Sequence, residues 1–119
     1  MAKSALPCLR LRIVFDAGHA FGPGKADLLD AIAAHGSIAA AGRALGMSYK
    51  RAWQLVDDLN RSFAAPLVQA SKGGGHGGGA ELTATGRKVL QAYRRIGRKA
   101  HTAAGAELRK LARLAAEPA

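Results

Sequence analysis

The sequence predicts a single, mainly α-helical domain with a small β-hairpin and a long C-terminal helix. Three observations lead to this fold class. Apolar residues recur at spacings of three and four in several segments, as on the buried face of a helix. One glycine-rich run, residues 71–79, separates two short strand-like segments. The 119 residues suit one domain, and the 49% hydrophobic content suffices for a core built mostly from Leu, Ile, Val and Ala.

The N-terminal part of the chain predicts one strand followed by one helix. Residues 9–15 place apolar side chains at every second position, as expected of a half-buried strand. Gly18 and the Gly-Pro-Gly run at 22–24 then break the chain. Residues 25–35 carry apolar positions at helical spacing, and Gly36 suits the C-terminal cap of that helix.

Two further short helices are expected directly afterwards, joined by a tight turn. Ser37 suits the N-cap of a helix that ends at Gly46, and Ser48 suits the N-cap of a helix from Tyr49 to about Asn60. Small residues on the first of these helices let the other cross it closely. The faces expected to be buried are Ile38, Ala41, Ala44 and Leu45 on the one, and Ala52, Val56 and Leu59 on the other.

A β-hairpin with a glycine-rich tip is predicted next. Pro66 bars further helix, and residues 67–70 and 80–82 resemble two short strands. Between them lies the sequence SKGGGHGGG, which favours a mobile tip because glycine loses the most entropy on ordering. Lys72 is well placed there to reach a phosphate, and His76 is interpreted as a polar spacer.

The last predicted element is one long helix, capped by Thr83 or Thr85. A helix of about 30 residues is too long to cover only a small core, so its apolar stripe predicts a contact between two protomers. Gly97 and Gly105 weaken this helix by about 1 kcal/mol each relative to alanine. The residues expected at the dimer contact are Val89, Tyr93, Ile96, Ala100, Leu108 and Leu111.

The charge of the chain predicts a polyanionic partner. Lys and Arg number 18 against 8 Asp and Glu, a formal net charge of +10. The excess is uneven, because nine basic residues and two acidic ones follow residue 83. Such a distribution attracts nucleic acid first and an anionic membrane surface second.

The predicted order of elements is that of a winged helix-turn-helix, in which residues 1–86 form the DNA-binding part and residues 87–119 the dimerisation helix of one structural unit. The major groove of duplex DNA accommodates such a third helix. Lys50 or Arg51 can read guanine or bind phosphate, and Gln54 can pair with adenine. Serine hydroxyls and helix N-termini can hold phosphates. The expected DNA-binding residues are Ser37, Ser48, Tyr49, Lys50, Arg51, Gln54 and Lys72.

Three segments, 36–38, 46–53 and 72–83, carry a family resemblance. The Ser-Tyr-Lys-x-Ala-Trp motif and the glycine-rich hairpin resemble the N-terminal DNA-binding domain of the ModE-type, molybdate-responsive transcription regulators, distant relatives of LysR-type winged helices. The similarity runs from about Leu9 to Ile96. It implies a bacterial, cytoplasmic homodimer that binds double-stranded DNA at specific sequences and regulates transcription, with residues 48–51 at the start of the recognition helix.

Regulators of this type carry a separate molybdate-binding module after this domain, whereas the present chain stops at Ala119. We therefore expect a DNA-binding protein that requires no cofactor and that does not bind molybdate tightly by itself. A link to molybdenum or oxyanion control of genes follows from the resemblance alone.

Two other functions fit parts of the sequence. A basic RNA-binding or nucleoid-associated protein without sequence preference would carry the same charge, because charge supplies most non-specific affinity. A basic amphipathic helix on an anionic membrane would fit residues 87–114, although its scarcity of aromatic residues counts against this. The alternative to a DNA-binding role for residues 37–60 is an ordinary helical hairpin whose polar face contacts only solvent.

Catalysis, metal binding and membrane insertion find no support in the sequence. The acidic residues are scattered, and no Ser/His/Asp or Cys/His pattern predicts an enzyme. The four histidines have no ligand partner at helical spacing, and the single cysteine, Cys8, excludes a multi-cysteine zinc site. No apolar run approaches the length needed to span a bilayer.

Overall fold

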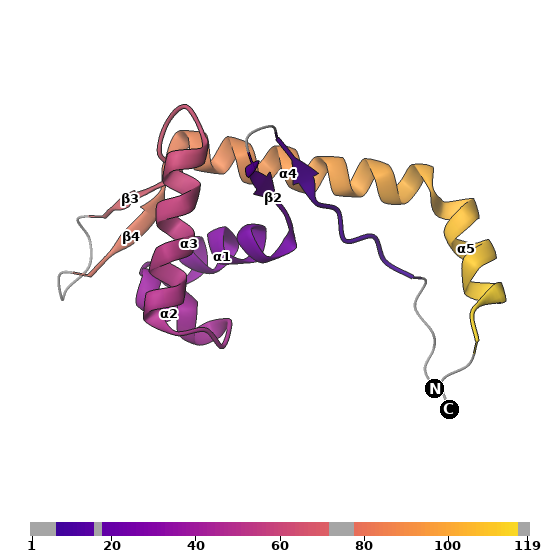
Figure 1. The fold of residues 1–119 in the computed structure, drawn as a ribbon, viewed down its shortest axis with the longest axis horizontal. Helices are drawn as coiled ribbons and strands as arrows, with labels where there is room; N and C mark the ends of the chain where they lie inside the picture. Colours follow the sequence, from indigo (N-terminus) through magenta and orange to yellow (C-terminus); the bar gives the residue numbers. More distant parts are fainter. Residues whose placement is uncertain (1–6, 16–17, 72–77, 117–119) are drawn as a thin grey trace.

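The computed structural model describes residues 7–15, 18–71 and 78–116. Three short helices and a β-hairpin form a compact body, and a long helix runs along one side of it and extends beyond it (Figure 1). The helices are α1 (Pro23–His35), α2 (Ile38–Ala44), α3 (Tyr49–Ser62), α4 (Ala84–Ala103) and α5 (Gly105–Leu114). The strands are β1 (Ile13–Val14), β2 (Ala20–Phe21), β3 (Val68–Ala70) and β4 (Ala80–Leu82). The mainly helical winged helix-turn-helix fold is thereby confirmed.

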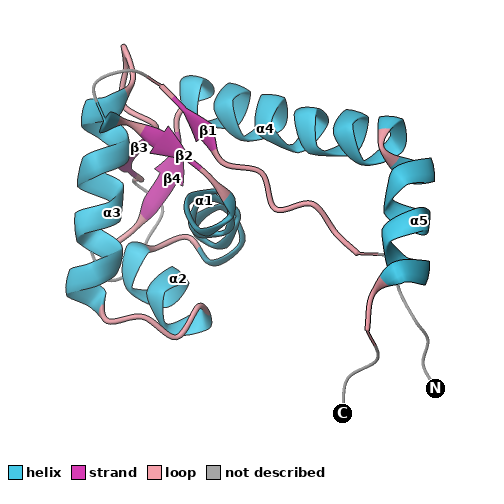
Figure 2. Cartoon of the chain, turned by 45° about the vertical axis from the view of Figure 1, so that its right-hand side comes forward, coloured by secondary structure: helices cyan, strands magenta, loops and turns pink. Residues whose placement is uncertain are grey.

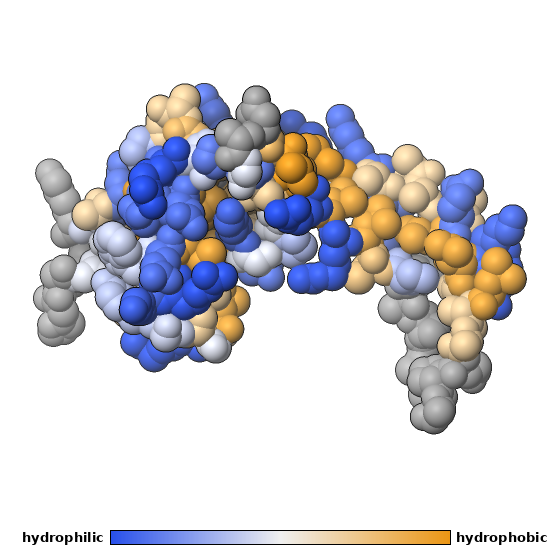
Figure 3. Space-filling model, viewed as in Figure 1, coloured by the Kyte–Doolittle hydropathy of each residue, from blue (hydrophilic) through white to orange (hydrophobic). Residues whose placement is uncertain are grey.

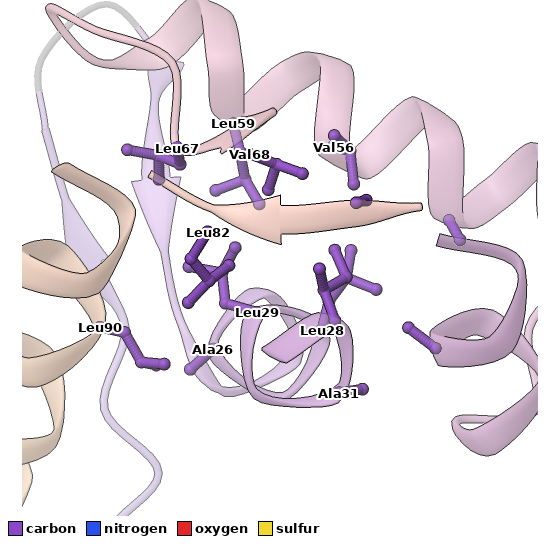
Figure 4. Packing of buried hydrophobic residues seen from close by; sticks show 14 of the residues in the cluster. Ala26, Leu28, Leu29, Ala31, Val56, Leu59, Leu67, Val68, Leu82 and Leu90 are labelled. Carbon is purple, nitrogen blue, oxygen red and sulfur yellow. The ribbon is translucent and has the colours of Figure 1, made fainter. Parts of the chain in front are cut away.

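The three short helices share one apolar core with the hairpin. Leu28 and Leu29 of α1 are fully buried, and Figure 4 shows them facing Leu82 of β4. On α3 the expected stripe is confirmed, because Ala52, Val56 and Leu59 are the buried residues of that helix.

The caps predicted from the sequence are present on both sides of the junction between α1 and α2. Gly36 ends α1 with φ 78°, a left-handed conformation that favours glycine, and its N–H donates to the carbonyl of Ile32 at 2.8 Å. Ser37 then caps α2, accepting the N–H of Ala40 at 3.0 Å. Local residue chemistry therefore determines where α1 ends and α2 begins.

The crossing of α2 and α3 differs in detail from the prediction. Ala41 and Gly42 are the buried residues of α2, and a Cβ added to Gly42 would lie 3.2 Å from the Cβ of Ala52. Ala44 and Leu45, which were expected on the buried face, are exposed. Leu45 leaves the helical face because α2 ends at Ala44 and Leu45 already belongs to the turn, whereas Ala44 is exposed in the last turn of the helix itself.

The predicted N-terminal strand is mostly an extended segment. Only Ile13 and Val14 form β1, which pairs antiparallel with β2, a strand that the sequence did not predict. The preceding residues lie along α4, where the carbonyl of Leu11 accepts a 2.6 Å hydrogen bond from the Tyr93 hydroxyl. This part of the N-terminal segment therefore bonds to a side chain of α4 instead of pairing with a strand.

The hairpin of β3 and β4 is confirmed, with Val68 opposite Leu82 and Ala70 opposite Ala80 (Figure 2). Val68 and Leu82 turn into the core, whereas Gln69 and Glu81 pair on the outside through a 2.7 Å hydrogen bond. The backbone N–H of Ala80 also donates to the carbonyl of Gly36, which ties β4 to the turn between α1 and α2.

The long C-terminal helix is not continuous. The prediction of one helix of about 30 residues was wrong, because α4 ends at Ala103 and α5 begins at Gly105 in a different direction (Figure 1). Ala104, with φ −91° and ψ 5°, separates the two. Glycine at 105 is a weak helix former, so a bend at this position costs little.

Helix α4 approaches the core most closely at its start. Thr83 caps α4, accepting the N–H of Gly86 at 2.9 Å, and its own N–H donates to the carbonyl of Leu67. A Cβ added to Gly86 would lie only 2.1 Å from that carbonyl oxygen. Glycine is therefore required at position 86 for α4 to rest on the chain at Leu67.

Two further contacts hold the middle of α4 against the body. The ring of Tyr93 meets Phe21 edge-on, with ring centroids 5.1 Å apart. Arg94 forms ion pairs with Asp27 and Asp30 of α1. The hydrogen bond to Asp30 is the largest cause that raises the pKa of Arg94 above its ordinary value.

Among the helices of the described residues, none has the length and apolar character that a membrane span requires.

Candidate nucleic-acid interface

The start of α3 brings most of the predicted site residues together. The Ser48 hydroxyl accepts the N–H of Arg51 at 3.0 Å, which caps the helix and leaves its N-terminal end open to solvent. Since the buried stripe faces the core, the opposite face is exposed. The exposed residues of the first two turns include Tyr49, Lys50, Arg51 and Gln54, all of which were predicted to contact DNA.

Of the two remaining predicted residues, Ser37 and Lys72, the structure describes only Ser37. Ser37 is half-buried at the N-cap of α2, next to Gly36, which bonds the start of β4. It therefore lies beside the end of the hairpin that adjoins the glycine-rich loop, where Ala80 pairs with Ala70. Lys72 and His76 lie outside the described residues.

Acidic side chains occupy the other end of α3. Arg61 pairs with Asp57 at 2.8 Å and with Asp58 at 3.6 Å; Arg61 and Asp58 are exposed, and Asp57 is half-buried. These aspartates lie two helical turns beyond the basic start of α3, and we expect them to stay away from a DNA backbone. Charge along α3 is thus graded from basic to acidic.

Asn60 connects α3 to the hairpin, a role that sequence reasoning did not predict. Its Oδ1 accepts the N–H groups of Leu67 at 2.9 Å and of Val68 at 3.0 Å. Its Nδ2 donates to the carbonyl of Val68 at 3.1 Å. One amide side chain therefore satisfies three backbone groups and sets the position of β3 relative to α3. No local pattern signals such a contact, because an asparagine in the last turn of a helix is unremarkable.

Replacing Asn60 by alanine is expected to lower the free energy of unfolding by about 2 kcal/mol, because buried backbone groups of Leu67 and Val68 lose their partner. Urea unfolding followed by circular dichroism measures this loss. Asn60→Asp is the matched variant: it keeps an acceptor for both N–H groups but sets a second oxygen against the Val68 carbonyl, so any stability above that of the alanine variant measures the two N–H bonds. An alanine variant as stable as the parent would show that water replaces the side chain at no cost.

A groove of about 470 Å³ separates α3 from the hairpin. Tyr49 and Trp53, one helical turn apart, form part of its α3 wall, and both are about half exposed, at 58% and 49%. Trp53 belongs to the Ser-Tyr-Lys-x-Ala-Trp motif, but no role was predicted for it from the sequence. The structure instead leaves its ring accessible beside the predicted DNA-binding residues.

Metal binding has no structural basis in the parts of the chain that the structure covers. Within residues 7–15, 18–71 and 78–116, no group of three or more His, Cys, Asp or Glu side chains could hold a metal ion. Cys8 is an exposed free thiol.

Three packed helices, of which the third exposes a basic, serine-capped start, together with a following hairpin define a winged helix-turn-helix domain. The chain belongs to the lysR family of bacterial regulatory helix-turn-helix proteins, whose profile matches residues 25–87, more than half of its length. The matched range begins within α1 and ends within α4. It therefore includes every element that builds the exposed start of α3.

Curated relatives carry names linked to molybdenum. The chain is 45% identical over 86 residues to the molybdenum-pterin-binding protein MopB of Rhodobacter capsulatus, covering 72% of this chain and 32% of the relative. It is 38% identical over 87 residues to the molybdenum transport protein ModE of Azotobacter vinelandii, covering 73% and 32%. With the DNA-binding transcriptional dual regulator ModE of Escherichia coli K12 the identity is 39% over 71 residues, covering 60% and 27%. The chain thus spans about a third or less of the length of these relatives. The resemblance to ModE-type N-terminal domains is confirmed.

Solved structures of similar fold include protein–DNA complexes. The DNA-binding domain of CbnR in complex with DNA superposes with a TM-score of 0.56 at 28% identity, covering 75% of this chain and 95% of that one. Full-length CbnR with its target DNA gives a TM-score of 0.54 at 26% identity, covering 71% and 27%.

Proposed function

We propose that this chain is a sequence-specific, double-stranded DNA-binding regulator of transcription that acts as a homodimer. The observation that carries the proposal is the serine-capped, exposed start of α3, where Tyr49, Lys50, Arg51 and Gln54 stand together on a helix anchored by its buried stripe. Relatives named as transcriptional regulators and structural neighbours bound to DNA support it.

Each element has a distinct part in this proposal. Helix α3 enters the major groove, where Lys50 or Arg51 reads guanine and Gln54 pairs with adenine. Ser37 and Ser48 hold phosphates at the helix starts, and Lys72 on the hairpin contacts the backbone. The proposal requires no cofactor and no catalytic step, and it places the protein in the cytoplasm, where a bacterial chromosome lies.

Dimerisation is proposed to use the apolar side of α4. Figure 3 shows apolar residues gathering over β1 and along α4 and α5, whereas the surface over α3 is hydrophilic. Ile96 is 44% exposed and lines an apolar hollow of about 230 Å³. The other residues around this hollow include Phe15, Phe63, Val89 and Ala92. We call this set the α4 surface.

The α4 surface differs from the residue set expected from the sequence. Tyr93 and Leu108 are 8% and 5% exposed, because the chain itself covers them, so they present little area to a partner. Val89 and Ala100 are half-buried, while Leu111 on α5 is exposed. Helical spacing alone does not distinguish a stripe that faces the core from one that faces a second protomer.

Replacing Ile96 by aspartate is expected to convert the dimer into a monomer, because a buried unpaired carboxylate opposes association. Sedimentation equilibrium over a range of concentrations measures this change. Gln91→Asp is the matched control: it adds the same charge at an exposed position of α4 outside the hollow. Loss of the dimer in both variants, or in neither, would place the interface elsewhere.

A link to molybdenum is proposed from the relatives, which include proteins named for molybdenum-pterin binding and for molybdenum transport. On this proposal, the regulated genes belong to the handling of molybdenum or a similar oxyanion.

Selection of bound duplexes from a random pool tests the proposed function. An inverted repeat is the expected outcome, since a two-fold dimer presents two equivalent recognition helices. Competition between the selected duplex and a scrambled one at fixed salt then measures specificity. Equal affinity for both would favour a basic protein that binds DNA or RNA without sequence preference.

A further inference from the structure

The groove between α3 and the hairpin has the wrong chemistry for a phosphate. The described residues that line it include no lysine or arginine, and the carboxylate of Asp57 lies at its wall. Phosphate contacts in protein–DNA complexes come mainly from basic side chains, polar donors and helix N-termini. Asn60 and Gln69 also line the groove, but their amides already bond the carbonyl of Val68 and the carboxylate of Glu81, and Asp57 is paired with Arg61.

The lining of the groove is mixed, and its apolar part lies beside the proposed DNA-binding face. Trp53 and Tyr49 form one wall, and the nearly buried side chains of Val56 and Val68 also line it. Tyr49 precedes Lys50 directly, so the aromatic wall is continuous with the exposed basic turn of α3. A partner that meets Lys50 and Arg51 therefore also meets these rings.

Among the groups that a DNA duplex presents, few are both neutral and apolar. The major groove displays the C5 methyl group of thymine, which proteins recognise by apolar contact, and this is the only base group there that is a hydrocarbon. We propose that Trp53, supported by Tyr49, reads thymine by packing its ring against that methyl group. This assignment rests on the DNA-binding function proposed above and adds a specificity-determining residue to it.

The half-exposed state of Trp53 supports this assignment. None of the aromatic pairs among the described residues involves Trp53, and it does not belong to the buried core. Its ring is therefore available without rearrangement of the fold. Contact with a methyl group would cover an apolar surface that is otherwise left in water.

The test removes the methyl group from the DNA and the ring from the protein, separately and together. In the duplex obtained by selection, each thymine is replaced in turn by deoxyuridine, which keeps base pairing and backbone intact. Affinities of the full chain and of Trp53→Ala are measured at one salt concentration. Trp53→Gln serves as a second variant, and thermal unfolding checks that each variant is folded.

For the parent chain, deoxyuridine at one or more positions should weaken binding about fourfold, as expected for a single buried methyl group. In the Trp53 variants, thymine and deoxyuridine at that position should bind equally well. Gln54→Ala is the control: it lowers overall affinity, and the ratio between thymine and deoxyuridine stays as in the parent.

Two results would overturn the assignment while leaving the proposed function intact. One is a parent chain that prefers the selected duplex over a scrambled one and is indifferent to every deoxyuridine. The other is a folded Trp53 variant that binds more weakly but keeps the full methyl effect, which would mean that the ring packs on a sugar. Absence of any preference for the selected duplex would instead refute the proposed function, and the assignment with it.

Discussion

Replacing Arg51 by alanine should weaken binding of a selected duplex by about tenfold to hundredfold, and binding of a scrambled duplex far less. Arg51 is exposed in the first turn of α3, where its backbone N–H is held by the Ser48 hydroxyl. A rigid helical start can aim a guanidinium at one base, and a bidentate contact to guanine discriminates by about 1–3 kcal/mol. Affinity plotted against the logarithm of salt concentration, for both duplexes, measures the effect.

Two matched replacements make this experiment specific. Arg61→Ala removes the same side chain from the acidic end of the same helix, where it pairs with Asp57, and should have little effect on either duplex. Lys72→Ala removes a proposed phosphate contact, so it should weaken all sequences alike and lower the salt slope by about 1 per protomer. Equal losses on both duplexes for Arg51→Ala would assign Arg51 to the backbone instead.

Replacing Gly86 by alanine should cost at least about 3 kcal/mol of the free energy of unfolding. The new methyl group would lie 2.1 Å from the carbonyl oxygen of Leu67. That carbonyl cannot retreat easily, because Leu67 is fully buried and its N–H is bound by Asn60. Helix α4 must therefore move away, which also breaks the bond from the Thr83 N–H.

Gly97→Ala is the control for this effect, because it makes the same change in the same helix. No atom lies within 4 Å of a Cβ added at Gly97. Alanine there should stabilise the protein by about 1 kcal/mol through its better helix propensity. Urea unfolding of the two variants should therefore give shifts of opposite sign. A Gly86→Ala variant as stable as the parent would mean that α4 and Leu67 are less tightly apposed.

The features that depend on neighbouring residues could be predicted from the sequence. Ser37, Ser48 and Thr83 cap helices because their hydroxyls reach backbone N–H groups three residues on. Gly36 ends α1 through its own backbone conformation. The exposed start of α3 follows from the same local rules, since its buried stripe determines which side chains face outward. Most of the candidate DNA-binding residues were found for this reason.

The features that depend on distant contacts could not be predicted. Strand β1 begins only at Ile13, and the carbonyl of Leu11 just before it is bonded to Tyr93, 82 residues away in the chain. Asn60 and Trp53 acquire their surroundings only when the hairpin folds back beside α3. Likewise, Tyr93 is buried because Phe21 and the backbone of Leu11, both distant in the chain, lie against it. Helical periodicity predicts that a stripe of apolar side chains is buried. It does not predict whether the same chain or a second protomer covers that stripe.

The graded charge of α3 has a consequence for how fast the protein finds DNA. Lys50 and Arg51 stand at the end of the helix that also carries the positive pole of its dipole, whereas Asp57 and Asp58 outnumber Arg61 towards the other end. In the field of a polyanion these charges exert a torque that turns the open end of α3 forward before contact. Encounters should then begin in a productive orientation, so that added salt slows association more than it speeds dissociation from a specific site.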